Sequence, residues 1–273
     1  MLIRCLFILL WSTTVFAQSP DEIKVDVTTL CKLSRVTGTD GCKQASAYLQ
    51  DQLQKNGYVV ELQEFSYKRQ ESANVLATKT APLDTVIVVG AHYDAVRGAP
   101  GADDNASGTA SVLAVAKMLK TKPTRHIVSF QLYAGEEQGL IGSAFYCKYP
   151  KWPIDKHIFM LNLDMVGYLK TGTYTLAAYK PPIDDILRSL FAKYAFAEKI
   201  TLRTGDDSDH ASFTEVGIPA IFLHTGLHNN YHKPSDTPDK LNYTGMANIC
   251  KYAEELVLAI DKSDTPNYFL ERQ

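Results

Sequence analysis

Five short polar segments of this 273-residue chain contain the residue types that bind metal ions or move protons. They are His92-Tyr93-Asp94, Asp104-Asn105, Gly135-Glu136-Glu137, Asn162-Leu163-Asp164 and Tyr231-His232-Lys233. Together they supply two imidazoles and three carboxylates as metal ligands, with one further carboxylate left free. Zinc takes nitrogen and oxygen ligands and activates water, so this set suits a pair of zinc ions in a hydrolase.

In two of these segments, one side chain can support the chemistry of a neighbouring side chain. Asp94 lies two positions after His92, where its carboxylate can accept the second imidazole N–H and fix the tautomer. The adjacent carboxylates of Glu136 and Glu137 point in different directions on a turn. One of them can therefore bind metal while the other takes a proton from water.

Other carboxylates in the set need a positive partner. If Asp103 and Asp104 both point into one site, they repel each other unless a dication lies between them, and one of them can bridge two ions. The same residue types also favour a plain turn or a helix N-cap. Asp164 lies inside a predicted apolar strand, and a carboxylate buried there without a partner is costly. His232 is followed by Asp236, again a histidine with a nearby carboxylate.

Strands and helices are expected to alternate along most of the chain. The predicted strands are 59–67, 73–79, 86–89, 126–133, 158–165, 174–178 and 219–224. The predicted helices are 22–35, 42–56, 105–120, 139–149, 183–195 and 243–261. This α/β pattern predicts a mixed, mainly parallel central sheet covered by helices on both faces. Ligands gather beyond the carboxyl ends of such strands, where His92, Glu136, Glu137 and Asp164 fall.

Composition narrows the class of protein. The chain is 45% hydrophobic and 21% charged, which is ordinary globular composition. The formal net charge is -2 without a basic stripe, so nothing supports nucleic-acid binding or electrostatic membrane docking. No linker, repeat or low-complexity run divides residues 18–273, which are expected to form a single domain. A monomer is expected.

The N-terminus has the pattern of a secretory signal. Arg4 precedes a mostly apolar run over 6–16, and Val15-Phe16-Ala17 places small residues before a cut at Gln18. We expect residues 1–17 to be removed, which leaves no stable membrane association. The protein is then exported to the periplasm or the medium. The alternative is an uncleaved anchor helix, for which the apolar run is short.

Removal of the signal leaves an even number of cysteines, which permits disulfides in an exported protein. They are Cys31, Cys42, Cys147 and Cys250. The first two flank a short glycine-containing turn, and Cys31–Cys42 is the favoured pair. Cys147 and Cys250 can pair as well, or can be small buried apolar residues. None has the C-x-x-C spacing of a metal site.

Six motifs in this chain also resemble those of a known family. In order they are G-A-H-Y-D, G-A-D-D-N-A-S-G, G-E-E-x-G-L-x-G-S, N-L-D-M-V-G, S-D-H-A-S-F with G-I-P-A, and Y-H-x-P-x-D-T. Over roughly residues 25–260 the chain resembles the M28 zinc aminopeptidases of the bacterial leucyl aminopeptidase type. The resemblance implies the zinc-exopeptidase fold, which is phosphorylase/hydrolase-like.

The resemblance implies a role for each matching residue. One zinc takes His92 and Asp164, the other takes Glu137 and His232, and Asp104 bridges the two. The peptide bond Asp104–Asn105 is expected to be cis. Glu136 is the general base, and Tyr231 donates to the developing oxyanion. Asp94 and Asp236 are the supporting carboxylates. The substrates are peptides with a free N-terminus, and the cofactors are two Zn²⁺ per chain.

Three other functions remain open at this stage. A glutaminyl cyclase shares the fold but uses one zinc, and a non-catalytic binding domain would lack some ligands or the base. A carboxypeptidase or dipeptidase of a related di-zinc fold is the third. The run Asp104-Asn105-Ala106-Ser107-Gly108 and the absence of Trp beside His232 favour the two-metal aminopeptidase. Asp207 stands where some relatives have an arginine near the product carboxylate, so the preferred N-terminal residue stays open.

Overall fold

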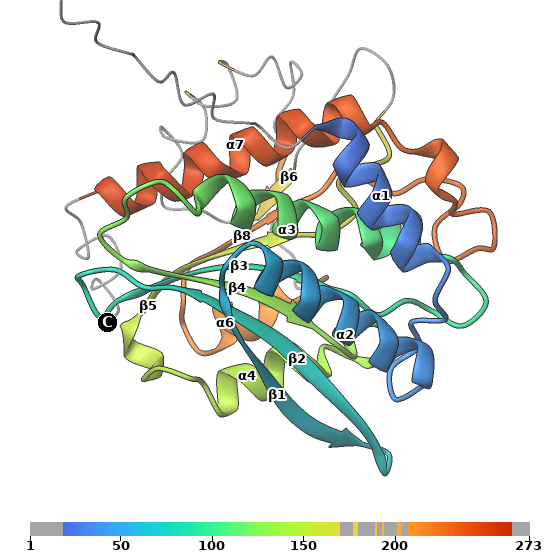
Figure 1. Cartoon of the computed structure of the whole chain (residues 1–273), viewed down its shortest axis with the longest axis horizontal. Coiled ribbons are helices and arrows are strands. Elements are labelled where there is room, and N and C mark those ends of the chain that lie inside the picture. The colour runs from blue at the N-terminus through green and yellow to red at the C-terminus, as the bar shows by residue number, and fades with distance from the viewer. Residues whose placement is uncertain are drawn as a thin grey trace, which may run out of the picture.

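Figure 1 shows the computed structural model of the chain, which describes residues 19–169, 177–179, 189, 193, 201–203 and 207–263. Within these residues a six-stranded sheet has the order β1-β2-β4-β3-β5-β8. Its strands are β1 (Val59–Tyr67), β2 (Gln70–Lys79), β3 (Val86–His92), β4 (Ile127–Tyr133), β5 (His157–Leu163) and β8 (Ala220–Leu223). The last four run parallel to one another, whereas β2 is antiparallel to β1 and β4. The predicted mixed, mainly parallel sheet is confirmed.

Helices cover both faces of this sheet, as predicted. One face carries α1 (Pro20–Cys31), α2 (Asp40–Lys55), α3 (Gly108–Leu119) and α7 (Tyr243–Lys262). The other carries α4 (Ile141–Lys148) and α6 (His210–Glu215). Strand β3 shows why both faces need cover: Ile87 and Val89 join the first hydrophobic cluster, while Val86 and Val88 join the second. Each of these fully buried side chains contributes about 1.5–3 kcal/mol.

Local sequence explains where the first two helices begin. Ser19 and Glu22 form a capping box at the start of α1, in which each side chain accepts the other residue's backbone N–H. Thr39 accepts the N–H of Cys42 at the start of α2. The helix predicted over 42–56 ends at Lys55, with Asn56 as its C-cap, and Gly57 follows with a positive φ of 78°.

Several predicted boundaries were wrong. The helix expected over 105–120 is preceded by the irregular turn η1 (Ala102–Ser107), in which Asp104 and Asn105 leave helical geometry. Strand β5 ends at Leu163, so Asp164 follows the strand instead of lying within it. The prediction missed helix α6 and strand β7 (Thr201–Arg203), which pairs with β6 (Ala177–Tyr179). The predicted signal at 1–17 and, apart from 189 and 193, the predicted helix at 183–195 lie outside the described residues.

The predicted disulfide is wrong, because the described cysteines all carry free thiols. The thiol of Cys42 lies near Tyr93 and that of Cys31 lies near Arg35, and neither is bonded to another cysteine. Cys147 and Cys250 belong to the two hydrophobic clusters on opposite faces of the sheet. Burial raises the pKa of the thiols of Cys31 and Cys42 to about 11, which leaves both protonated and weakly reactive at neutral pH.

No helix of the described part of the chain is both long and apolar enough to cross a bilayer.

Candidate metal centre

The predicted ligands converge at the carboxyl edge of the parallel strands. His92 is the last residue of β3, and Asp164 directly follows β5. Glu137 lies in the short helix η2 (Glu136–Gln138) after β4, and His232 lies in the loop after β8. Asp104 reaches the same point from η1. Two strand ends, a short helix, a loop and an irregular turn thus bring together residues spread over 141 positions of the sequence (92 to 232).

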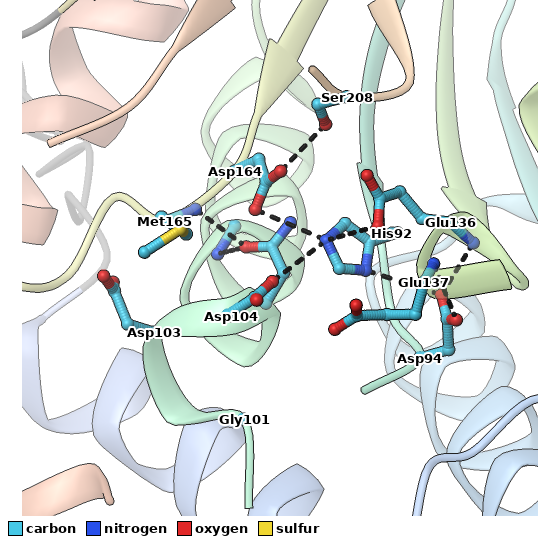
Figure 2. A network of polar contacts seen from close by, with 12 residues as sticks. His92, Asp94, Gly101, Asp103, Asp104, Glu136, Glu137, Asp164, Met165 and Ser208 are labelled. Atoms are coloured by element: carbon cyan, nitrogen blue, oxygen red, sulfur yellow. Dashed lines mark hydrogen bonds and ion pairs between the residues drawn. The ribbon is translucent and has the colours of Figure 1, made fainter. Parts of the chain in front are cut away.

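These side chains form two groups that share one carboxylate. Nε2 of His92 lies 3.3 Å from Oδ1 of Asp104 and 3.3 Å from Oδ1 of Asp164 (Figure 2). Nε2 of His232 lies 2.9 Å from Oδ2 of Asp104 and 3.2 Å from Oε2 of Glu137. In each group the ligand atoms all lie within 4.8 Å of one another. One oxygen of Asp104 therefore faces each histidine.

The ionised form of Asp104 is strongly favoured. Its side chain is nearly buried, and burial alone would raise its pKa. The rings of His232 and His92 outweigh burial and hold the pKa of this carboxyl well below its usual range. An ionised carboxylate between two imidazoles provides the negative charge that two neighbouring cations require.

Several polar atoms in these groups are buried without a hydrogen-bond partner among the described residues. They are both ring nitrogens of His92, Oε1 of Glu137 and Oδ1 of Asp164. An unsatisfied buried polar group costs about 1–3 kcal/mol, and more if it is charged. Nitrogen and carboxylate donors that face one another without protein partners fit divalent zinc ions.

The two neighbouring glutamates have shifted acidities. Burial raises the pKa of Glu136 to about 9, His92 opposes this, and the charges of Asp164 and Asp209 add to it. Burial, together with the charge of Asp104, raises the pKa of Glu137 to about 8. A divalent cation in the centre lowers such values, because it favours the ionised carboxylate. Glu136 belongs to neither ligand group, yet its Oε2 lies 3.9 Å from Nε2 of His92.

Asp94 holds the turn that carries both glutamates. Its carboxylate accepts the backbone N–H groups of Glu136 at 3.2 Å and Glu137 at 3.3 Å, and the hydroxyl of Thr37 at 2.9 Å. The sequence predicted a contact with His92, and Nδ1 of that ring does lie 3.4 Å from Oδ1 of Asp94. The fully buried carboxylate therefore links β3 to η2 (Figure 2).

Asp236 has a different partner from the one expected. The sequence placed it beside His232, but its carboxylate accepts the backbone N–H groups of Asp103 and Asp104 at 3.0–3.1 Å. It therefore fixes η1, the turn that presents Asp104. The bond Asp104–Asn105 within this turn is cis, as the family resemblance implied.

Tyr231 lies against the second ligand group. Its ring stacks on that of His232, with centroids 3.7 Å apart and planes at 24°. Burial and the surrounding carboxylates raise the pKa of its hydroxyl above the usual value. The phenol therefore stays protonated at neutral pH and keeps an O–H to donate.

Sequence reasoning missed residues that support the ligands. Ser208 donates to Oδ2 of Asp164 at 2.8 Å and accepts from the amide of Asn162 at 2.8 Å. The guanidinium of Arg35, almost fully buried, donates to the carbonyls of Tyr93, Pro100 and Gly101. Ser208 lay within a quoted motif and so carried a signal, but nothing near Arg35 in the sequence indicated its partners.

Comparison with known proteins identifies the family of this chain. Residues 74–257 match the model of "Peptidase family M28". A probable leucine aminopeptidase of Arthroderma otae is 32% identical over 197 residues, which are 64% of this chain and 55% of that protein. The chain spans about half the length of the curated relatives it matches first.

Solved structures show the same fold at low sequence identity. A zinc aminopeptidase from Bacillus subtilis has a TM-score of 0.81 at 16% identity, with 92% of this chain and 97% of that chain covered. A glutaminyl cyclase from Porphyromonas gingivalis has a TM-score of 0.77 at 17% identity, with 89% and 99% covered. The fold is thus common to both kinds of enzyme, whereas the family match extends over most of the sheet and its site. The chain therefore belongs to peptidase family M28.

Proposed function

We propose that this protein is a di-zinc aminopeptidase that removes the N-terminal residue from peptides. The observation that carries this proposal is the shared carboxylate of Asp104, whose two oxygens face two separate ligand groups. Membership of the peptidase family and the leucine aminopeptidases among its relatives support the reaction class.

Each zinc would be held by one of the two groups. His92, Asp164 and Asp104 would hold the first, and Glu137, His232 and Asp104 the second. When bound, zinc ions of this kind polarise a carbonyl oxygen and lower the pKa of water towards about 7. The carboxylates around the centre would also attract the free α-amine of the substrate, which accounts for an exopeptidase rather than an endopeptidase.

Glu136 is the proposed general base. Its carboxylate lies beside the first group but is not one of its ligands, and its side chain is 14% exposed, so water and substrate can reach it. It takes the proton from the attacking water and later delivers it to the leaving amine nitrogen. Asp94, through the backbone of η2, keeps this carboxylate in place.

Tyr231 is the proposed oxyanion donor. Its protonated hydroxyl donates to the carbonyl oxygen as negative charge develops there. The stack on His232 holds the phenol at the edge of the centre.

Substitution of the base tests this assignment. The E136Q variant should still bind two zinc ions but should lose about 10²–10⁴-fold in kcat on leucyl p-nitroanilide, because the amide cannot accept the proton. The exposed Glu64 gives a matched control, E64Q, which should keep full activity. Wild-type activity should disappear with a chelator and return with zinc. Normal turnover in E136Q with bound zinc would remove Glu136 from the role of base.

Glutaminyl cyclisation remains the second candidate function because a solved cyclase has a TM-score of 0.77, close to the 0.81 of the aminopeptidase. The two candidates differ in metal content and product. One zinc per chain, with ring closure of an N-terminal glutamine and no release of leucine, would favour the cyclase. A chain that binds zinc but turns over neither substrate would favour a non-catalytic binding domain.

We also propose that residues 1–17 direct export and that residues 18–273 act as a single domain and a monomer. Export would carry the enzyme to peptides outside the cytoplasm. N-terminal sequencing of the mature protein tests the cleavage site, with Gln18 as the expected first residue.

A further inference from the structure

Asp103, the neighbour of the shared Asp104, belongs to neither ligand group. Its side chain is fully buried, and Figure 2 shows its carboxylate turned away from His92, whereas that of Asp104 points towards it. A buried carboxylate needs partners of its own, because desolvation of an unpaired charge is costly. The identity of those partners shows what this residue does.

One oxygen of Asp103 holds the segment that follows Asp164. Oδ1 accepts the backbone N–H of Gly167 at 2.7 Å and that of Tyr168 at 3.1 Å. Ser107 adds a second link, since its hydroxyl donates to the carbonyl of Asp103 and accepts the N–H of Val166. The chain just beyond the ligand Asp164 is therefore tied to η1.

The other oxygen of Asp103 holds the loop that contains His232. Nε2 of His228 lies 3.1 Å from Oδ2 of Asp103. Nδ1 of the same ring accepts the backbone N–H of Asn230 at 3.1 Å, so the proton resides on Nε2 and is donated to Asp103. The ring of His228 is also stacked on Tyr168, with centroids 4.1 Å apart and planes at 22°.

The two ligand histidines depend on such support to different degrees. His92 is the fully buried last residue of β3, a strand that pairs with β4 and β5, and His92 itself pairs with Tyr133 of β4. His232 lies in a loop, with a side chain that is 37% exposed and a φ of 57° that is uncommon for residues other than glycine. The loop before it is held through His228, whose carbonyl accepts the N–H of Tyr231.

We propose that Asp103 and His228 are positioning residues that set the affinity of the second zinc group, which consists of Asp104, Glu137 and His232. They act by fixing the loop of His232 against η1 and contact neither the ion nor the substrate. The first group depends on them less, because strand β3 holds His92 and Ser208 donates a hydrogen bond to Asp164. This inference rests on the two-zinc function proposed above.

Three variants separate the hydrogen bond from the packing. H228F keeps an aromatic ring against Tyr168 but removes the donor. H228Q keeps an N–H donor near the position of Nε2 but loses the stack. D103N keeps an oxygen for Gly167 and Tyr168 while it places an amide N–H opposite the N–H of His228. His126 lies outside the ligand groups and contacts Thr85, so H126F is the control histidine.

Titration of the apoproteins with zinc, in competition with a chromophoric chelator, measures both affinities. In H228F and D103N, one zinc should bind as in the wild type and the other should bind about 10–100-fold more weakly, the usual effect of losing a residue that orients a ligand. H228Q and H126F should bind both ions as the wild type does. Unchanged affinities in H228F would overturn the inference, as would weak binding in H228Q with normal binding in H228F.

Two further measurements distinguish a failure of this inference from misfolding of a variant and from failure of the two-zinc proposal. Circular dichroism and thermal unfolding of the apoproteins show whether each variant folds; if H228F does not, D103N decides. If the wild type binds only one zinc, the proposed two-zinc function fails. If the wild type binds two and the variants bind both equally well, only the role of Asp103 and His228 fails.

Discussion

The two ligand groups differ in how the chain holds them. The group of His92 and Asp164 is built at the ends of two adjacent parallel strands, and His92 is fully buried. The group of Glu137 and His232 is built from a short helical turn and a loop, and the imidazole of His232 is 37% exposed. Asp104 contributes one oxygen to each group.

This difference indicates that the two groups depend on different parts of the fold for their geometry. Strand ends are fixed by the backbone hydrogen bonds of the sheet, so the first group is preformed by the fold itself. The second group depends on side-chain contacts such as those of Asp94 with η2 and of Asp103 with His228. The first site should therefore be sensitive to changes that affect folding, and the second to changes that affect loop geometry.

Removal of the shared charge should have the largest effect. In D104N one oxygen becomes an amide nitrogen that cannot bind metal, so both affinities should fall and kcat/KM on leucyl p-nitroanilide should drop by at least about 10³-fold. Zinc content and steady-state kinetics measure this. D239N, at an exposed aspartate, is the control. Two tightly bound zincs in D104N would show that Asp104 is not shared.

Substitution of the two histidines should separate the groups by stability. His92 is surrounded by the carboxylates of Glu136, Asp164 and Asp104, which raise its pKa well above the usual value although burial opposes them. Without a metal it is protonated and pairs with them, so H92Q should destabilise the apoprotein by about 3–5 kcal/mol. H232Q should change apoprotein stability by less than about 1 kcal/mol, because the side chain is partly exposed.

Urea unfolding of the two apoproteins measures this contrast. Zinc titration provides a second test, because H232Q should lose only one of the two tight zinc sites. Equal destabilisation by the two substitutions would contradict the division between a preformed group and a loop-built group.

A buried acid outside both ligand groups serves as a reference for a titration that involves no metal ligand. Asp26 in α1 is 7% exposed and accepts a hydrogen bond from Tyr48. Burial raises its pKa from 3.8 to about 6, and no imidazole lies among the groups that shift it. The folded state therefore holds the proton more tightly than the unfolded chain, and stability must fall as the pH rises from about 4 to 6.

The D26N variant removes this titration while it keeps an oxygen for Tyr48. Relative to the wild type, it should gain about 2–3 kcal/mol of stability between pH 4 and pH 7. Unfolding curves of both apoproteins at these two pH values measure the gain. A difference between the proteins that does not change with pH would show that burial does not raise the pKa of Asp26.

Much of the architecture could be predicted from local pattern. The strand predicted over 86–89 is observed as β3, and its continuous β-branched run is typical of a strand buried on both faces, as β3 is. Apolar strands that end in polar residues predicted the edge at which Glu137 and Asp164 lie. Such predictions succeed because hydrophobic periodicity depends only on residues close together in the sequence and can be recognised without the rest of the fold.

The errors arose where distant contacts decide the structure. Cys31 and Cys42 are close in sequence, but packing directs their thiols to different neighbours. The helix expected from residue 105 is replaced at its start by η1, which Asp236 holds from 133 positions away. The spacing of residues along the chain contains no information about either contact.

The sequence by itself determined which groups this protein can offer to a metal and at which edge of the sheet they stand. Only the tertiary structure decided that Asp104 faces two histidines, that Asp103 turns away to hold two loops, and that Asp94 supports η2. The physical reason is the separation along the sequence of the residues that determine each feature. Strand and helix formation follow from side chains a few positions apart, whereas the direction of a carboxylate depends on donors that other loops bring to it.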